Sequence, residues 1–317
     1  MLYTEGQSTE YTRRERASRG RAQQSGVEGA EPLMISPISL HRNTAELEAK
    51  RARLEDSLRD LGSAIVAYSG GADSALLLRV AHDVLGPRAV GAIALSESIP
   101  ADEVAAAVRV AEQEIGVTLY KLQTHEMERP EYRRNDADRC YYCKTELFDV
   151  LEPLAVQLGI DHILYGANHD DLGDHRPGQR AARERGVHGP LLDAGFTKAE
   201  VRLLSRQLGL STWNKPAMAC LSSRIPHGTP ITRAALSMVE QAEACLHSLG
   251  LPQVRVRTYG TTARIEAPQS DLLTLVQPQV RAQVVQKLHE IGYDFITLDL
   301  EGFRSGSMNI HAAPGHA

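Results

Sequence analysis

Cysteine, aromatic side chains and long apolar runs are scarce in this chain. Its 317 residues include 4 cysteines, 1 tryptophan and 4 phenylalanines. So few cysteines in so long a chain argue against a disulfide-dense scaffold. We recognise no signal peptide and no apolar run long enough to span a bilayer. We therefore expect a protein of the reducing cytoplasm with no membrane partner.

A large excess of charge of one sign is also missing. The chain has 35 Lys and Arg against 40 Asp and Glu, a formal net charge of −5. Nucleic-acid surfaces usually carry a clustered excess of Lys and Arg, so a nucleic-acid partner is disfavoured. A small anionic substrate needs only a local basic pocket. The hydrophobic content of 42% is typical of a globular protein, and the length predicts two domains plus a tail.

A Walker A loop is absent as well, because the spacing G-x-x-x-x-G-K-[ST] does not occur. In its place, an apolar run at 64–68 leads into the turn SGGADS at 69–74 and then into a helical pattern. Adjacent glycines let the backbone approach an anion, and N–H groups at a helix start carry partial positive charge. The turn therefore predicts a phosphate site. Asp73, where a Walker loop has Lys, favours a metal-bridged polyphosphate.

This turn resembles the loop of the PP-loop ATP pyrophosphatases, which split ATP into AMP and pyrophosphate while they adenylate a substrate. The resemblance implies that ATP is bound here, with Mg²⁺ near Asp73, and that Asp73 takes part in catalysis. The implied ATP ligands are Ser69, Gly70, Gly71, Asp73, Ser74 and Ser96.

Strand-like apolar runs alternate with helical patterns in the first two thirds of the chain. Strands are expected near 64–68, 89–95, 117–122 and 162–166, and helices at 101–115 and 181–209. This alternation predicts an α/β fold of the PP-loop ATP pyrophosphatase type (adenine nucleotide alpha hydrolase-like), a parallel sheet with helices on both faces. Ligands are expected beyond the carboxyl ends of the strands.

The composition changes beyond residue 228, where an α-β-β-α-β order predicts a smaller α+β domain. Its expected elements are helices at 233–249 and 270–291 and strands at 253–258, 262–267 and 295–300. The predicted organisation is a disordered arm at 1–43, the PP-loop domain at 44–215, which opens with a helix, the α+β domain at 216–309 and a tail at 310–317.

Three of the four cysteines occupy two short segments. Cys140 and Cys143 form a C-x-x-C pair, expected on a loop that runs into a helix. Such pairs hold zinc, iron–sulfur clusters or a redox disulfide. Cys220 follows much later in the chain. Cys245 lies in a helical pattern and is expected to be a buried small hydrophobe.

Polar residues that could bind metal or substrate occur at two places. Asp170, Asp171 and Arg176 follow the expected strand at 162–166, although any one such acid is more often simply solvated. Arg255 and Arg257 alternate with valines, so both guanidinium groups are expected on one face of a strand. Arginine forks bind phosphate bidentately, and the alternative is an ordinary surface salt bridge.

Five segments together resemble the LarE family over residues 47–309. They are SGGADS, DDLGDHRPG, NKPAMACLSSRIPHGT, RVRTYGTTARIE and LDLEGFRSGSMN. The resemblance implies an ATP-dependent sulfur transferase in the synthesis of the nickel-pincer nucleotide cofactor of lactate racemase. Family members adenylate the carboxylates of pyridinium-3,5-biscarboxylic acid mononucleotide and convert each into a thiocarboxylate. The implied substrate or phosphate ligands are Asp170, Asp171, Arg176, Ser223, Arg224, Arg255 and Arg257, and the implied divalent-cation ligands are Glu243 and Glu266.

Two sulfur sources are known in that family. In the sacrificial type, a cysteine before the S-S-R motif gives up its own sulfur, and the C-x-x-C pair is missing. This chain keeps the pair, so Cys140, Cys143 and Cys220 resemble the type in which three thiolates hold a 4Fe-4S cluster and leave one iron open for an exogenous sulfur. Ala219, beside Cys220, has no sulfur to donate. Sacrificial transfer from Cys220 is the alternative.

Two other functions fit parts of the pattern. A tRNA-thiolating enzyme also combines this loop with a C-x-x-C pair and a distant cysteine, but the acidic net charge and the lack of a basic surface interleaved with aromatic residues disfavour it. A non-catalytic ATP-binding module has no use for three spaced cysteines. The sequence does not specify the sulfur donor. We expect a homo-oligomer.

Overall fold

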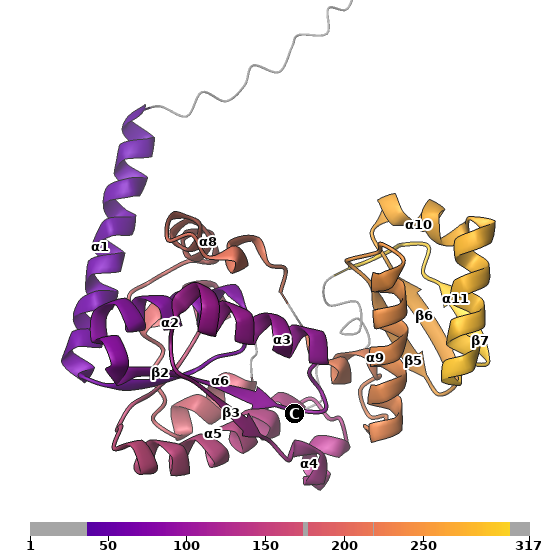
Figure 1. Cartoon of the computed structure of the whole chain (residues 1–317), viewed down its shortest axis with the longest axis horizontal. Helices are drawn as coiled ribbons and strands as arrows, with labels where there is room; N and C mark the ends of the chain where they lie inside the picture. The colour runs from indigo at the N-terminus through magenta and orange to yellow at the C-terminus, as the bar shows by residue number, and fades with distance from the viewer. Residues whose placement is uncertain (1–36, 174–176, 218, 305–317) are drawn as a thin grey trace, which may run out of the picture. The chain divides into compact units, whose positions relative to one another are not determined.

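A four-stranded parallel sheet lies at the centre of the N-terminal part of the fold (Figure 1). The computed structural model describes residues 37–173, 177–217 and 219–304. The strand order is β3-β2-β1-β4, and every neighbouring pair is parallel. The predicted parallel sheet is therefore confirmed. The strands are β1 (Ala64–Ala67), β2 (Ala89–Leu95), β3 (Leu119–Gln123) and β4 (Ile163–Tyr165).

Helices cover both faces of this sheet. The helices of this part of the chain are α1 (Pro37–Leu61), α2 (Ala72–Leu85), α3 (Ala101–Arg109), α4 (Pro130–Arg133), α5 (Arg139–Leu158), α6 (Pro177–Glu184), α7 (Pro190–Asp193) and α8 (Lys198–Gln207), of which α4 packs away from the sheet. Successive residues of a strand point to opposite faces. Ala64 and Val66 pack in an apolar core with α2 and α8, whereas Ile65 and Ala67 pack in a second core with α5 and α6. Figure 1 shows α2 and α5 on opposite sides of the strands.

A second, three-stranded sheet follows in the C-terminal part and has its own apolar core. Strands β5 and β6 form a hairpin that turns at Gly260, whose φ of +60° favours glycine. Strand β7 pairs with β6 in parallel, which requires a crossover through helices. The predicted smaller α+β fold is confirmed. Its elements are α9 (Arg233–Ser248), β5 (Arg255–Tyr259), β6 (Thr262–Glu266), α10 (Gln269–Val276), α11 (Pro278–Ile291) and β7 (Phe295–Leu298).

Three helix predictions were wrong in detail. The single helix expected at 270–291 is broken between α10 and α11, because Pro278 forces the preceding Gln277 out of the helical region, to a ψ of 136°. The helix expected at 101–115 is α-helical only to Arg109 and continues as a π-helix at Val110–Ile115. The stretch 181–209 contains the end of α6, then α7 and α8 with turns between them.

The cysteine pair was also misplaced by the sequence analysis. Cys140 and Cys143 lie inside α5, which begins at Arg139, and not on a loop before it. At the other end of the PP-loop part, α1 begins at Pro37, earlier than the expected start at residue 44. No helix in the described ranges is long and apolar enough to cross a membrane.

Several predictions concern residues outside the described ranges. They are Arg176, the arm up to residue 36, and the tail at 310–317. The boundaries of the predicted domains stay predictions.

The start of α2 lies directly against Gly166, the residue after β4. A Cβ atom on Gly166 would lie 2.6 Å from the backbone nitrogen of Ser74 and 2.8 Å from its Cα. Both atoms are backbone, so they cannot rotate away from the added methyl group. Glycine is therefore required for the loop at 69–74 to reach its place beside the end of β4.

We predict that Gly166→Ala lowers the free energy of unfolding by about 1–3 kcal/mol, because the methyl group displaces the first turn of α2. Urea unfolding measures the loss. The matched control is Gly189→Ala, where the nearest atom would be a side-chain carbon of Tyr165 at 3.2 Å, and the loss should be smaller. Equal stability of Gly166→Ala and the wild type would contradict the close approach.

Candidate functional site

The turn at 69–74 is held by its own hydroxyl groups. Gly70 has a φ of +72°, and a Cβ atom there would lie 2.5 Å from the Cβ of Ala107. The backbone N–H of Ser69 donates to Ser74 Oγ at 3.2 Å, and Ser74 Oγ donates to the carbonyl of Gly71 at 3.2 Å. Gly71 is the N-cap of α2 and makes no side-chain cap bond. The helix start therefore presents its N–H groups where an anion can bind.

Asp73 lies in the first turn of α2 and has two partners from distant parts of the chain. Asn168 Nδ2 donates to Asp73 Oδ1 at 3.1 Å, and Lys198 Nζ donates to Asp73 Oδ2 at 2.5 Å. The backbone N–H of Lys198 also donates to Asp170 Oδ2 at 2.9 Å. The structure thus brings Asp73 and Asp170 together through one lysine.

Asp171, the other predicted acid, contacts the backbone of Asn168. Asp171 follows β4 in a short 3₁₀ turn, and its Oδ2 accepts from the N–H of Asn168 at 3.0 Å. Asp171 thereby orients the residue that contacts Asp73. The predicted acid cluster at the end of β4 therefore lies beside the phosphate-type loop.

A second lysine supports the loop from the segment that leads to Cys220. Lys215 Nζ donates to the carbonyl of Gly70 at 3.1 Å and pairs with Glu103 at 2.7 Å. The loop at 69–74 is thus connected to the Cys220 segment through a single side chain.

Ser96, at the end of β2, belongs to a buried polar cluster with Ser98 and Glu126. Glu126 is only 2% exposed and accepts hydrogen bonds from the hydroxyl groups of both serines. The carbonyl of Ser98 accepts from the N–H of Leu221 at 2.8 Å. The edge of the sheet that carries the loop is therefore joined to the residue after Cys220.

The three cysteines of the two segments lie near one another. Cys143 packs against an apolar cluster that includes Leu221, the neighbour of Cys220. Burial raises the pKa of the Cys143 thiol most, and together with the nearby Glu126, Cys220 and Cys140 brings it to about 12. The thiol therefore keeps its proton until a cation takes its place. Cys245, on α9, is partly exposed, so the prediction that it is buried was wrong.

These cysteines do not converge on one point. In the parts of the chain described above, no group of three or more His, Cys, Asp or Glu residues is placed to hold a single metal ion. An iron–sulfur cluster has a different requirement, because each cysteine binds a different iron atom and the ligands are spread around the cluster. Three thiols from α5 and the Cys220 segment have the ligand chemistry of such a cluster, and the cluster stays a prediction.

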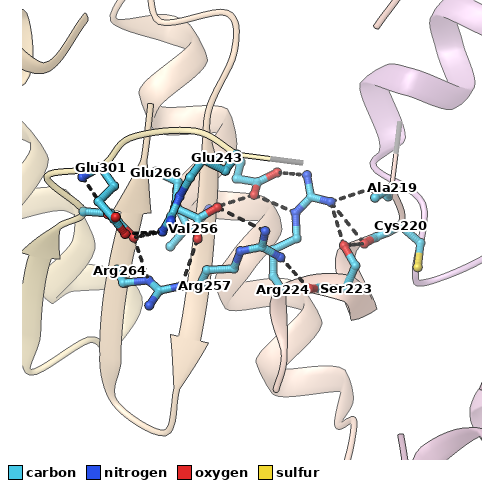
Figure 2. A network of polar contacts seen from close by, with 12 residues as sticks. Ala219, Cys220, Ser223, Arg224, Glu243, Val256, Arg257, Arg264, Glu266 and Glu301 are labelled. Carbon is cyan, nitrogen blue, oxygen red and sulfur yellow. Dashed lines mark hydrogen bonds and ion pairs between the residues drawn. The ribbon is translucent and has the colours of Figure 1, made fainter. Parts of the chain in front are cut away.

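Arg224 fixes the backbone of the Cys220 segment (Figure 2). It is 4% exposed and forms a fork with Glu243, with both N···O distances at 2.9 Å. Its Nη1 donates to the carbonyls of Ala219 at 2.6 Å and Cys220 at 3.2 Å. Figure 2 shows the sulfur of Cys220 pointing away from this network. Arg224 thus holds the main chain and leaves the thiol accessible to other partners.

A second arginine contacts the same segment. Arg257 Nη1 donates to the carbonyl of Ser223 at 2.7 Å, and its Nη2 donates to Glu266 at 3.0 Å. Glu266 is fully buried and also accepts from Arg264 at 2.9 Å. The two predicted cation ligands, Glu243 and Glu266, are therefore both paired with arginines, and a divalent cation there stays a prediction.

Arg255 differs from the other two predicted phosphate ligands. It is half-buried, and its guanidinium lies 4.4 Å from the ring centre of Phe303. Its side chain forms no hydrogen bond or ion pair with the rest of the described chain. Burial lowers the pKa of Arg255, and the neighbouring charges of Arg257 and Arg224 lower it further. A bound anion would relieve this repulsion, so Arg255 is the best placed of the three to hold a phosphate.

Comparison with known proteins places the chain in a family. No family model matches it. It is 46% identical to an uncharacterized protein of Synechocystis sp. over 263 residues, 83% of this chain and 98% of the relative. It is 37% identical over 265 residues to the pyridinium-3,5-bisthiocarboxylic acid mononucleotide synthase of Lactiplantibacillus plantarum, 84% of this chain and 95% of that protein. The chain belongs to the LarE family. An uncharacterized protein of Methanocaldococcus jannaschii is 26% identical over 248 residues.

The structure adds four residues to the site of this LarE-family chain that sequence reasoning missed. Lys198, Lys215, Glu126 and Arg139 each contact a predicted residue or its immediate neighbour. Lys215 lies in one of the five segments that resemble the family, and Glu126 follows β3, but no motif marks any of the four as a site residue. Their partners are remote in sequence, so only the fold reveals them.

We predict that Glu243→Ala lowers the free energy of unfolding by about 3–5 kcal/mol, because it leaves the Arg224 charge buried without its partner. Urea unfolding measures this loss, and alkylation of Cys220 should become faster as its segment loosens. The control is Arg233→Ala, which breaks an exposed pair with Glu97 and should cost less than about 1 kcal/mol. Equal losses of unfolding free energy in the two variants would show that the Arg224–Glu243 pair does not anchor the Cys220 segment.

Proposed function

We propose that this chain is an ATP-dependent sulfurtransferase that converts the carboxylates of pyridinium-3,5-biscarboxylic acid mononucleotide into thiocarboxylates. This is a step in the synthesis of the nickel-pincer nucleotide cofactor. One observation carries the proposal. In a chain 37% identical to a named bisthiocarboxylate synthase, three cysteines from two segments lie near one another and are linked to a phosphate-type loop.

The first step uses the loop at 69–74. The N–H groups at the start of α2 and the hydroxyls of Ser69 and Ser74 bind the phosphates of ATP, and Asp73 holds Mg²⁺. Lys198 then moves from Asp73 to a phosphate oxygen. A substrate carboxylate oxygen attacks the α-phosphorus, the bond to pyrophosphate breaks, and an acyl-adenylate forms. These residues act by positioning and charge neutralisation.

The substrate is held through its own phosphate. Arg255 binds this group, since its guanidinium forms no ion pair in the described chain and lies beside the charges of Arg257 and Arg224. Arg224 and Arg257 act indirectly. Their hydrogen bonds fix the backbone from Ala219 to Ser223. Ser223 donates its hydroxyl to the Cys220 carbonyl at 2.7 Å, which further fixes this turn.

The second step delivers sulfur. Cys140, Cys143 and Cys220 hold a 4Fe-4S cluster as its three protein ligands. When bound, such a cluster supplies an iron with an open position for an exogenous sulfur. The sulfur nucleophile attacks the acyl carbon, AMP leaves with the electrons of the broken C–O bond, and a thiocarboxylate remains. Sulfur suits this step because it is strongly nucleophilic at neutral pH.

We predict that Asp73→Asn lowers the rate of substrate-dependent pyrophosphate release by about 100-fold or more, because the amide cannot hold the metal ion on the triphosphate. A coupled pyrophosphate assay measures the rate. The control is Asp83→Asn on the same helix, whose carboxylate pairs with Arg79 at the surface. Pyrophosphate release at the wild-type rate in Asp73→Asn would remove Asp73 from the proposed site.

We predict that anaerobically reconstituted protein binds about four iron atoms per chain. Replacing Cys140, Cys143 or Cys220 with Ala should remove both the iron and the sulfur transfer, whereas Cys245→Ala should keep both. Iron and acid-labile sulfide analysis gives the content.

The sacrificial alternative leads to the opposite result. Mass spectrometry after turnover would then show Cys220 lighter by one H₂S, turnover would stop after one transfer, and Cys140→Ala would stay active. That outcome would replace the cluster with Cys220 as the sulfur donor.

A further inference from the structure

A buried arginine beside the cysteines has no acidic partner among the residues that the structure describes. Arg139, the first residue of α5, is 7% exposed. Its Nη1 donates to Asn135 Oδ1 at 2.5 Å and to the carbonyl of Ser222 at 3.0 Å, and both acceptors are neutral. No carboxylate in the described chain forms an ion pair with it. A buried charge without a counter-ion is costly, so this side chain needs an explanation.

A nearby arginine shows the usual solution. Arg129 pairs with Glu146 at 2.6 Å and with Asp149. Two carboxylates therefore balance the charge of Arg129, although its side chain is 30% exposed and needs them less. The more deeply buried Arg139 is left with an amide and a carbonyl.

The surroundings of Arg139 identify what its charge faces. It precedes Cys140 in the chain, and it holds the carbonyl of Ser222, two residues after Cys220. The N-terminus of α5 adds partial positive charge at the same place.

We propose that Arg139 is the counter-cation of the sulfur site, where its guanidinium stabilises the anionic sulfur ligands at Cys140, Cys143 and Cys220 and attracts an incoming hydrosulfide anion. The inference rests on the proposed cluster. Thiolates and hydrosulfide all carry negative charge, and they supply the counter-charge that Arg139 lacks in the protein alone. If Arg139 served only as a tether, linking the two cysteine segments by a hydrogen bond, a neutral donor would be enough. Tethering therefore does not explain why the side chain is charged.

Two variants separate the charge from the tether. Arg139→Gln keeps an N–H donor for the Ser222 carbonyl and loses the charge, whereas Arg139→Lys keeps the charge. Each is reconstituted anaerobically with iron and sulfide. Iron content, the midpoint potential of the cluster and the affinity for added sulfide are then compared with those of the wild type. Arg129→Gln is the matched control, because it removes a guanidinium that carboxylates already balance.

We expect Arg139→Gln to shift the midpoint potential to more negative values, because a lost positive charge disfavours the added electron. Its affinity for hydrosulfide should fall by about tenfold or more, the scale of one charge–charge interaction in a partly buried site. Loss of the cluster from folded Arg139→Gln would also support the proposal if Arg139→Lys retains it. Arg139→Lys and Arg129→Gln should match the wild type in midpoint potential and sulfide affinity, although Arg129→Gln loses stability because it leaves the buried Glu146 without its cation.

Wild-type potential and sulfide affinity in Arg139→Gln would overturn the inference and leave the proposed function intact. Equal changes in the Gln and Lys variants would also overturn it, because they would indicate a tether that requires the arginine shape. Wild-type protein that takes up no iron would instead refute the proposed cluster, and this inference would fail with it.

Discussion

The buried fork between Arg224 and Glu243 determines where Cys220 lies. Glu243, on α9, accepts both nitrogens of the fork and also the N–H of Val256 on β5. Arg224 in turn holds the carbonyls before and at Cys220. One ion pair thus joins a helix, a strand and the cysteine segment. Buried pairs of this kind add little net stability compared with apolar residues, but removing one partner is costly. Their value here is to define one position for the segment.

The arginines of the site divide into two groups according to what balances them. Arg224 and Arg257 each pair with a buried glutamate and fix the backbone of the Cys220 segment. Arg255 and Arg139 are also at least half-buried, but no carboxylate in the described chain pairs with either of them. Charge left unbalanced in a partly dry site is available to a ligand. The first group therefore builds the site, and the second is suited to anions.

Local patterns predicted most of the fold and the segments of the site. The turn SGGADS, the strands and the cysteine pair are short-range signals that depend on near neighbours. The break at Pro278 was also present in the sequence, yet the apolar period over 270–291 concealed it. The contact between Lys198 and Asp73 joins residues 125 positions apart. Sequence patterns of one chain do not specify such pairs, because tertiary packing decides which charges meet.

The lysine on Asp73 has a consequence for how a nucleotide would enter. Asp73 is mostly shielded from water, and the ammonium group of Lys198 lies 2.5 Å from one of its oxygens. A magnesium ion that binds Asp73 would thus replace the ammonium group of Lys198 rather than bind a carboxylate without a counter-ion. The ammonium group of Lys198 balances the negative charge of Asp73 within the chain itself. Asp73 is then never buried without a cation beside it. The displaced ammonium group of Lys198 can bind the phosphates of the nucleotide instead.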